Sequence, residues 1–121
     1  MNTIVITGVG VVSPLGIGID VLWNNLLSSK TSLQHFNDLE AAGYRNTSAC
    51  RVTDFEAPQI TRGACMALEA AKQAIAQSNI QLPKNTGIFL GSTLGESMAY
   101  ELAAEGEPID PEAYNTFSIA K

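Results

Sequence analysis

A short apolar segment followed at once by a glycine-rich turn constrains the fold of this chain most. Residues Thr3–Thr7 (TIVIT) are apolar and β-branched, which predicts a buried strand. Because both faces of this segment are apolar, the strand is expected to belong to a parallel sheet covered on both sides. The turn Gly8–Gly18 (GVGVVSPLGIG) follows, and Asp20 is placed to cap a helix that runs to Leu27. The N-terminal residues therefore predict a strand, a turn and a helix in succession.

The middle of the chain continues this alternation. Ala49–Val52 is expected to form a second short strand, and Gly87–Gly91 (GIFLG) a third buried one. Between them, Thr61–Ser78 is the strongest predicted helix, ended by Asn79 and Pro83. Its apolar side chains recur at spacings of three and four, which predicts one packed face. That face consists of Ala64, Leu68, Ala71 and Ile75, and small side chains at Ala67, Ala70 and Ala74 widen it, so that the helix can lie close to its neighbours.

The C-terminal part predicts two more helices. Glu96–Ala104 is one of them, and Pro111 suits the first turn of a last short helix. The order of strands and helices is typical of an α/β protein, and no linker divides residues 1–121 into separate domains.

Charge and composition argue against several classes of function. The chain has a net charge of −5, whereas nucleic-acid binding needs a basic face. It has no apolar stretch near the roughly 20 residues that span a bilayer, and no basic cluster opens a secretory signal. Cys50 and Cys65 lack metal-ligand spacing and are expected to be reduced thiols of a cytoplasmic protein, with buried, small apolar side chains.

A nucleotide-binding loop is the weaker interpretation of the glycine-rich turn. Gly8 and Gly10 supply the first two glycines of the dinucleotide fingerprint, but its third position falls on Ser13, and Pro14 follows. No acidic residue is suitably placed at the end of a second strand to hold a ribose hydroxyl. The glycines are better explained by close packing or a positive φ, and no cofactor is expected.

The same turn resembles the start of the β-ketoacyl-acyl carrier protein synthases. These proteins begin with a strand and a Val-Val-(Ser/Thr)-Pro-Leu-Gly turn, here Val11–Gly16. The resemblance continues in the family's order over nearly the whole chain. The matching segments are Val21–Ser29 (VLWNNLLSS), Phe36, Val52–Phe55 (VTDF), Arg62–Ala76 and Gly87–Gly95 (GIFLGSTLG).

This resemblance implies a fold and a chemistry. The fold would be the N-terminal part of a thiolase-like, α-β-α layered ketosynthase, with a mostly parallel sheet and packed helices. The family condenses acyl and malonyl thioesters held on acyl carrier protein, in fatty-acid, polyene or polyketide synthesis. A cysteine thiolate accepts the acyl group, two histidines assist decarboxylation of the malonyl unit, and backbone amides form an oxyanion hole. The family uses no cofactor, and a homodimer or heterodimer is expected.

The catalytic residues of the family are expected beyond Lys121. Its nucleophile lies in a Thr-Ala-Cys-(Ser/Ala) motif at a helix start, whereas Cys50 falls in a predicted strand and Cys65 inside a predicted helix. His35 is expected to be a solvated loop histidine without a nucleophile or carboxylate at useful spacing. A non-catalytic partner subunit, similar to a chain-length factor, is therefore an open alternative.

Arg62 is the one candidate binding residue. In the family the approach to the alanine-rich helix is often basic and faces the acidic carrier protein, which implies a carrier contact for Arg62. The alternative is a surface residue at the start of a helix. The acidic run of Glu96, Glu101, Glu105 and Glu107 is interpreted as a solvated face, and no metal site is predicted.

Overall fold

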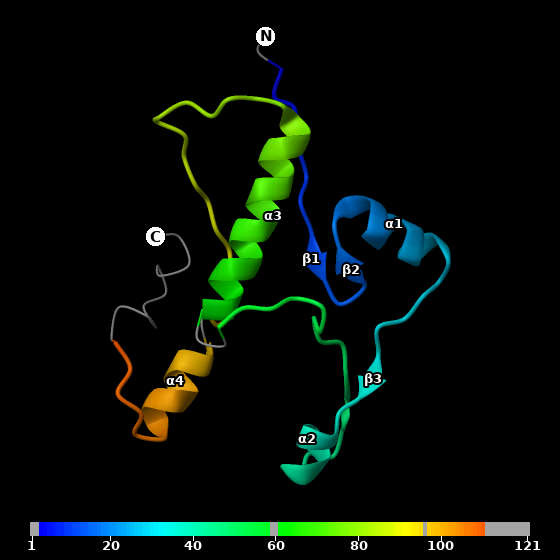
Figure 1. Cartoon of the computed structure of the whole chain (residues 1–121), viewed down its shortest axis with the longest axis vertical. Helices are drawn as coiled ribbons and strands as arrows, with labels where there is room; N and C mark the ends of the chain where they lie inside the picture. Colours follow the sequence, from blue (N-terminus) through cyan, green and yellow to red (C-terminus); the bar gives the residue numbers. More distant parts are fainter. Residues whose placement is uncertain (1–2, 59–60, 96, 111–121) are drawn as a thin grey trace.

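The computed structural model describes residues 3–58, 61–95 and 97–110, and its longest element is a central helix, α3 (Figure 1). The N-terminal segment runs alongside this helix, and the remaining elements extend to either side of its lower half. Within the described ranges, no helix combines the length and the apolarity of a membrane span. The elements in chain order are β1 (Val12–Ser13), β2 (Gly16–Ile17), α1 (Ile19–Leu27), β3 (Gln34–His35), α2 (Asn37–Ala41), β4 (Ser48–Ala49), α3 (Arg62–Ser78) and α4 (Ser97–Ala104).

The predicted turn forms a tight antiparallel hairpin of β1 and β2. Val12 pairs with Ile17 and Ser13 with Gly16, so that Pro14 and Leu15 form the connection. The fixed φ of proline suits this position, and Gly16 has a φ of 127°, which favours glycine. The hairpin leads directly into α1.

The predicted cap of α1 is wrong by two residues. Gly18 is the N-cap, with a φ of 96°, and Asp20 lies in the first turn instead. The backbone freedom of Gly18 lets the helix begin earlier, and an acidic residue in the first turn still complements the helix dipole. Asn25 of α1 then holds the hairpin, because its side-chain amide donates to the Leu15 carbonyl at 2.6 Å.

The two later helices agree closely with the sequence. Helix α3 ends at Ser78, and Asn79 adopts the left-handed conformation with a φ of 51°, which is typical of a helix C-terminus. Helix α4 matches the predicted segment from Ser97 onward, whereas Glu96 and the helix predicted at Pro111 lie outside the described residues.

The N-terminal segment approaches α3 so closely that two of its residues have to be glycine. A β-carbon on Gly8 would collide with the carbonyl oxygen of Ala74, and one on Gly10 with that of Ala70. The glycines of the turn therefore serve close packing between an extended segment and a helix, as expected from the sequence.

The side of α3 that makes this contact is the small-residue side of the predicted face, as expected. The contact uses Ala70 and Ala74, whereas Leu68 and Ile75, the larger residues of that face, are 56% and 40% exposed. Helical periodicity identifies an apolar face but does not name its partner, and in the described residues most of this face is uncovered.

Two of the three predicted strands are absent, and the third is shifted. Thr3–Thr7 and Gly87–Gly91 form no strand, and their side chains are open, with Ile4 97% and Phe89 98% exposed. The expected Ala49–Val52 strand is β4 at Ser48–Ala49, which pairs antiparallel with β3. A strand is defined by its neighbour, and the described residues bring no segment alongside the first two. Both observed ladders are antiparallel, so the mostly parallel sheet is not seen here.

The contact with α3 predicts that Gly10→Ala destabilises the chain. The new methyl group has to displace the segment from Ala70, at an expected cost of about 1–3 kcal/mol in the free energy of unfolding. Urea titration followed by circular dichroism measures this cost. The matched control is Gly91→Ala, where nothing lies within 4 Å of the new atom, with an expected change under about 0.5 kcal/mol. Equal effects of the two substitutions would contradict the close approach.

Candidate functional site

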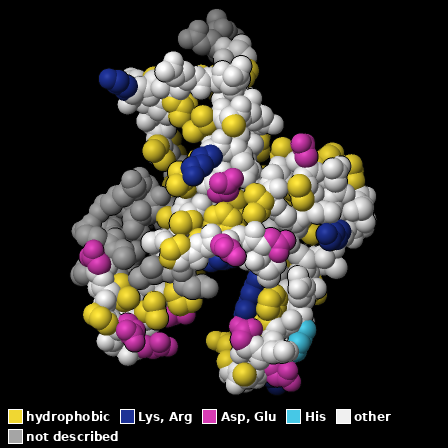
Figure 2. Space-filling model, in the orientation of Figure 1, with side chains coloured by type: hydrophobic (Ala, Val, Ile, Leu, Met, Phe, Trp, Pro, Cys, Tyr) yellow, Lys and Arg dark blue, Asp and Glu magenta, His cyan; other side chains and the backbone are white. Residues whose placement is uncertain are grey.

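The described residues enclose a groove of about 810 Å³ between α2, the segment after β4, the start of α3, and α4. Figure 2 shows the corresponding hollow in the lower part of the molecule, with basic side chains on its wall. Its lining combines basic, acidic and aromatic side chains, including Arg51, Arg62, Asp38, Glu101, Phe36 and Phe55. The groove is therefore amphipathic.

Arg51 is held by α2 at one side of the groove. Its guanidinium donates to the Asp38 carboxylate at 2.7 Å and lies over the Phe36 ring, 4.3 Å from the centroid. The hydrogen bond from Arg51, helped by its positive charge, lowers the pKa of Asp38 below the ordinary value of 3.8. The charge of Arg51 is thus compensated within the groove.

Arg62 is the first residue of α3 and is placed differently. Its Nη2 donates to the backbone carbonyl of Val52 at 2.6 Å, and its guanidinium lies 5.9 Å from the Phe55 ring centroid. Within the described ranges it makes no ion pair with a carboxylate. The N-terminal end of the α3 dipole adds positive potential at the same place. The positive charge of Arg62 is therefore less compensated by neighbouring groups than that of Arg51.

Sequence reasoning anticipated part of this site. Phe36, the Val52–Phe55 segment and Arg62 were singled out separately, and the structure brings them together around one groove. Arg51 and Asp38 were missed as members of the site. They are 13 positions apart and gave no sequence signal, because the antiparallel pairing of β3 with β4, on either side of α2, is what brings them together.

Comparison with known proteins identifies the family. The model of the β-ketoacyl synthase N-terminal domain matches residues 1–119. The chain belongs to the β-ketoacyl synthase family.

Curated synthases resemble the chain over most of its length. The 3-oxoacyl-[acyl-carrier-protein] synthase 2 of Staphylococcus aureus (strain COL) is 26% identical over 113 residues, covering 83% of this chain and 27% of the relative. The protein of the same name from Coxiella burnetii is 29% identical over 105 residues, covering 76% of this chain and 25% of the relative. The chain thus spans about a quarter of the length of these synthases.

A solved structure carries the same fold. The ishigamide ketosynthase/chain length factor matches with a TM-score of 0.70 and 25% identity, covering 95% of this chain and 34% of the solved chain. The likeness supports the thiolase-like ketosynthase architecture expected from the motifs.

The two cysteines are less buried than the sequence predicts, and Cys50 lies outside the strand in which it was expected. Cys50 is an exposed free thiol directly after β4. Cys65 is a half-buried free thiol within the first turns of α3, with its sulfur 3.9 Å from the Thr61 hydroxyl. Neither stands in the family's nucleophile motif, so neither is assigned a catalytic role.

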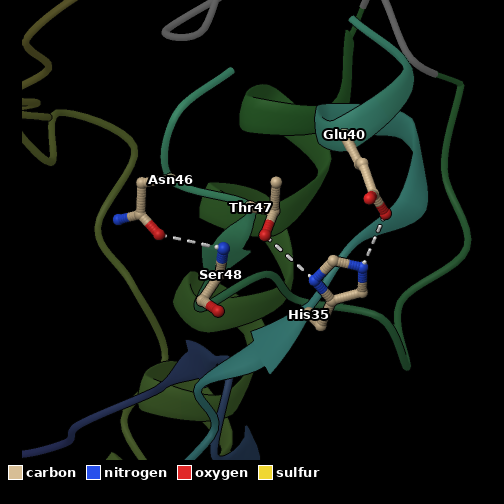
Figure 3. Close-up of polar contacts among 5 residues, drawn as sticks. All are labelled: His35, Glu40, Asn46, Thr47 and Ser48. Carbon is tan, nitrogen blue, oxygen red and sulfur yellow. Dashed lines mark hydrogen bonds and ion pairs between the residues drawn. The ribbon is translucent and has the colours of Figure 1, made fainter. Parts of the chain in front are cut away.

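His35 corrects one expectation. It is solvent-exposed as expected, but it lies in β3 and has both a hydroxyl and a carboxylate as partners (Figure 3). Its Nδ1 is 3.0 Å from the Thr47 hydroxyl, and its Nε2 is 3.3 Å from the Glu40 carboxylate. Sequence spacing concealed this arrangement, because the antiparallel pairing of β3 with β4 brings Thr47 back beside β3. Since the side chains of His35 and Glu40 are 50% and 69% exposed, the pair is a weak brace between β3 and α2.

The acidic residues near α4 remain in solvent. Glu101, Glu105 and Glu107 are exposed, which confirms the solvated face for these three, and Glu101 also reaches the groove. In the described part of the chain, no group of three or more possible metal-ligating side chains comes together.

The ion pair in the groove predicts a change in acid titration. Because the pKa of Asp38 is lowered in the folded chain, the pair stabilises the fold above the ordinary pKa, and this contribution is lost as pH falls through the lowered value. Arg51→Gln is expected to raise the Asp38 pKa towards 3.8. NMR titration of the carboxyl carbon measures the shift. Arg62→Gln is the control variant, in which the pKa of Asp38 is expected to stay unchanged. If the Asp38 pKa is also unchanged in Arg51→Gln, the pairing of Arg51 with Asp38 is refuted.

Proposed function

We propose that this chain forms the N-terminal part of a β-ketoacyl-acyl carrier protein synthase. Such an enzyme condenses an acyl thioester with malonyl-acyl carrier protein and releases carbon dioxide. The observation that carries the proposal is the match of the synthase N-terminal domain to residues 1–119. The fold similarity to a ketosynthase supports it independently of the family motifs.

In this proposal the chain contributes scaffold rather than reacting groups. A cysteine thiolate and two histidines beyond Lys121 carry the acyl transfer and decarboxylation, with no cofactor. Thr3–Thr7 and Gly87–Gly91 are extended, apolar and exposed, which suits strands of a mostly parallel sheet whose neighbours come from other residues. The parent protein acts in the cytoplasm as a homodimer or heterodimer, in fatty-acid, polyene or polyketide synthesis.

A second function is favoured by one observation. The similar solved structure is named as a ketosynthase together with a chain length factor. The chain is therefore also compatible with a non-catalytic partner subunit that shares the N-terminal motifs. The coding sequence after Lys121 distinguishes the two hypotheses. A synthase requires the nucleophile motif and two later histidines, whereas a partner subunit lacks the cysteine.

The first prediction from this proposal concerns catalysis. Residues 1–121 alone are expected to give no ketoacyl product from acyl and malonyl carrier thioesters, whereas the protein that contains them together with the nucleophile motif gives product. Mass spectrometry of the carrier-bound products measures both. Turnover by residues 1–121 that disappears in Cys50→Ala or Cys65→Ala would overturn the assignment of the catalytic groups. An inactive protein that nevertheless has the motif would overturn the synthase reading.

We further propose that Arg62 contacts the acidic carrier protein. Its positive charge lies at the groove, without an ion pair in the described residues, at the positive end of the α3 dipole. An acidic partner would supply the missing carboxylates, and such charge complementarity mainly steers association.

Charge reversal at Arg62 tests this contact. Arg62→Glu in the protein that contains this chain is expected to weaken carrier binding about tenfold at low salt, with a smaller effect at high salt. Lys72→Glu makes the same charge change at an exposed position on the same helix and is expected to leave the Kd nearly unchanged. Surface plasmon resonance with immobilised carrier measures both. Equal weakening by the two variants would reduce the effect to net charge and contradict a contact at Arg62.

A further inference from the structure

Arg51 and Arg62 both line the groove, and one stretch of backbone connects them. Arg62 donates to the carbonyl of Val52, the residue that directly follows Arg51. Each guanidinium also lies near an aromatic ring. Arg51 is 4.3 Å from the centroid of Phe36, and Arg62 is 5.9 Å from that of Phe55. The groove therefore contains two guanidinium groups, each held by at least one contact that is not an ion pair.

Neither guanidinium uses all of its N–H donors within the described residues. Arg51 donates from Nη1 to Asp38, and Arg62 donates from Nη2 to the Val52 carbonyl. The remaining donors form the planar fork of an arginine side chain, which fits the two oxygens of a carboxylate. Two such forks in one groove suit a partner that has several carboxylates.

Asp38 is what distinguishes the two arginines. Its carboxylate lies 2.7 Å from Nη1 of Arg51 and neutralises that side chain, whereas Arg62 has no carboxylate partner in the described ranges. The hydrogen bond from Arg51 lowers the pKa of Asp38, so this carboxylate is ionised at neutral pH. An acidic partner therefore has to compete with Asp38 for Arg51.

The ion pair is exposed enough to permit this competition. The side chains of Arg51 and Asp38 are 39% and 62% exposed. Exposed ion pairs add little net stability, because water screens the charges and the ordering of two side chains costs entropy. The contact of Arg51 with the Phe36 ring needs no carboxylate, so we expect the guanidinium to stay at the groove without Asp38.

We propose that Asp38 is an intramolecular competitor that masks Arg51, so that the groove presents Arg62 alone to an acidic partner. The partner class is a protein segment with several carboxylates, which rests on the carrier contact proposed for Arg62. Asp38 thereby limits the affinity of the groove. Glu101 also lines the groove, but it pairs with neither arginine among the described residues and masks neither of them.

Removal of the Asp38 charge in the protein that contains this chain tests the masking. The probe is a fluorescently labelled decaglutamate peptide, and fluorescence anisotropy at low salt measures its Kd. Asp38→Asn keeps the shape of the side chain and removes its charge. Arg51→Gln removes the guanidinium, alone and together with Asp38→Asn. Glu101→Gln is the matched control, because it removes one negative charge from the same groove and leaves the ion pair intact.

Asp38→Asn is expected to tighten peptide binding about fivefold, because it frees a second guanidinium for the peptide. Arg51→Gln alone and Glu101→Gln are each expected to change the Kd less than about twofold. The double variant is expected to bind like Arg51→Gln alone. An unchanged Kd in Asp38→Asn, a gain that survives Arg51→Gln, or an equal gain in Glu101→Gln overturns the proposal.

Surface plasmon resonance of the same variants on immobilised carrier separates this inference from the proposed carrier contact. If the peptide shows the gain that depends on Arg51 but neither the native protein nor Asp38→Asn binds carrier, the masking stands and the carrier contact of Arg62 is contradicted. If the native protein binds carrier and Asp38→Asn brings no gain with either ligand, the masking alone is contradicted.

Discussion

The contact between the N-terminal segment and α3 is the constraint on which the other elements depend. It joins residues 62 and 68 positions apart in the sequence through the hydrogen bonds to Gln73 and Gln77. Glycines at the contact remove the side chains that would hold the two backbones apart. The hairpin is continuous with this segment and contacts α3 and α1, so the anchored segment positions the chain as far as the end of α1 at Leu27. A loss at this contact would therefore be transmitted to elements that do not touch α3 directly.

The groove depends on the other end of the same helix. Arg62 at the start of α3 fixes the carbonyl of Val52, and the segment that follows β4 is thereby tied to the helix. The same segment begins with Arg51, whose pairing with Asp38 connects it to α2. Arg51 and Arg62 thus have different electrostatic roles, because Arg51 pairs with a carboxylate and Arg62 donates to a backbone carbonyl. This difference makes Arg62 the more suitable group for an acidic partner.

The exposed apolar surface is consistent with the place of this chain in a larger family fold. Ala99 is the one hydrophobic residue classed as buried in the described part of the chain, whereas Ile4, Ile6, Ile88 and Phe89 are largely open to solvent. Covering about 200 Å² of such surface is worth on the order of 5 kcal/mol, comparable with the stability of a whole domain. The curated synthases are about four times as long as the region that matches this chain.

Local chemistry by itself was enough to predict α1, α3, α4 and the turn at Pro14, and to identify the family, whereas it gave no sign of α2. Periodicity, the Asn79 stop and the proline-glycine turn act over a few residues, so α3 and the connection at Pro14 could be predicted. The family motifs likewise identified Phe36 and Arg62 as members of a shared architecture. Tertiary structure decided which segments contact one another. The pairing of Thr3–Thr7 as a strand and the burial of Leu68 depend on which segments come together. The same holds for the contacts of His35 with Glu40 and of Arg51 with Asp38. Strand pairing and burial each require two segments in contact. The residue pattern of one segment shows that it can pair or be buried, but does not identify the segment that it contacts.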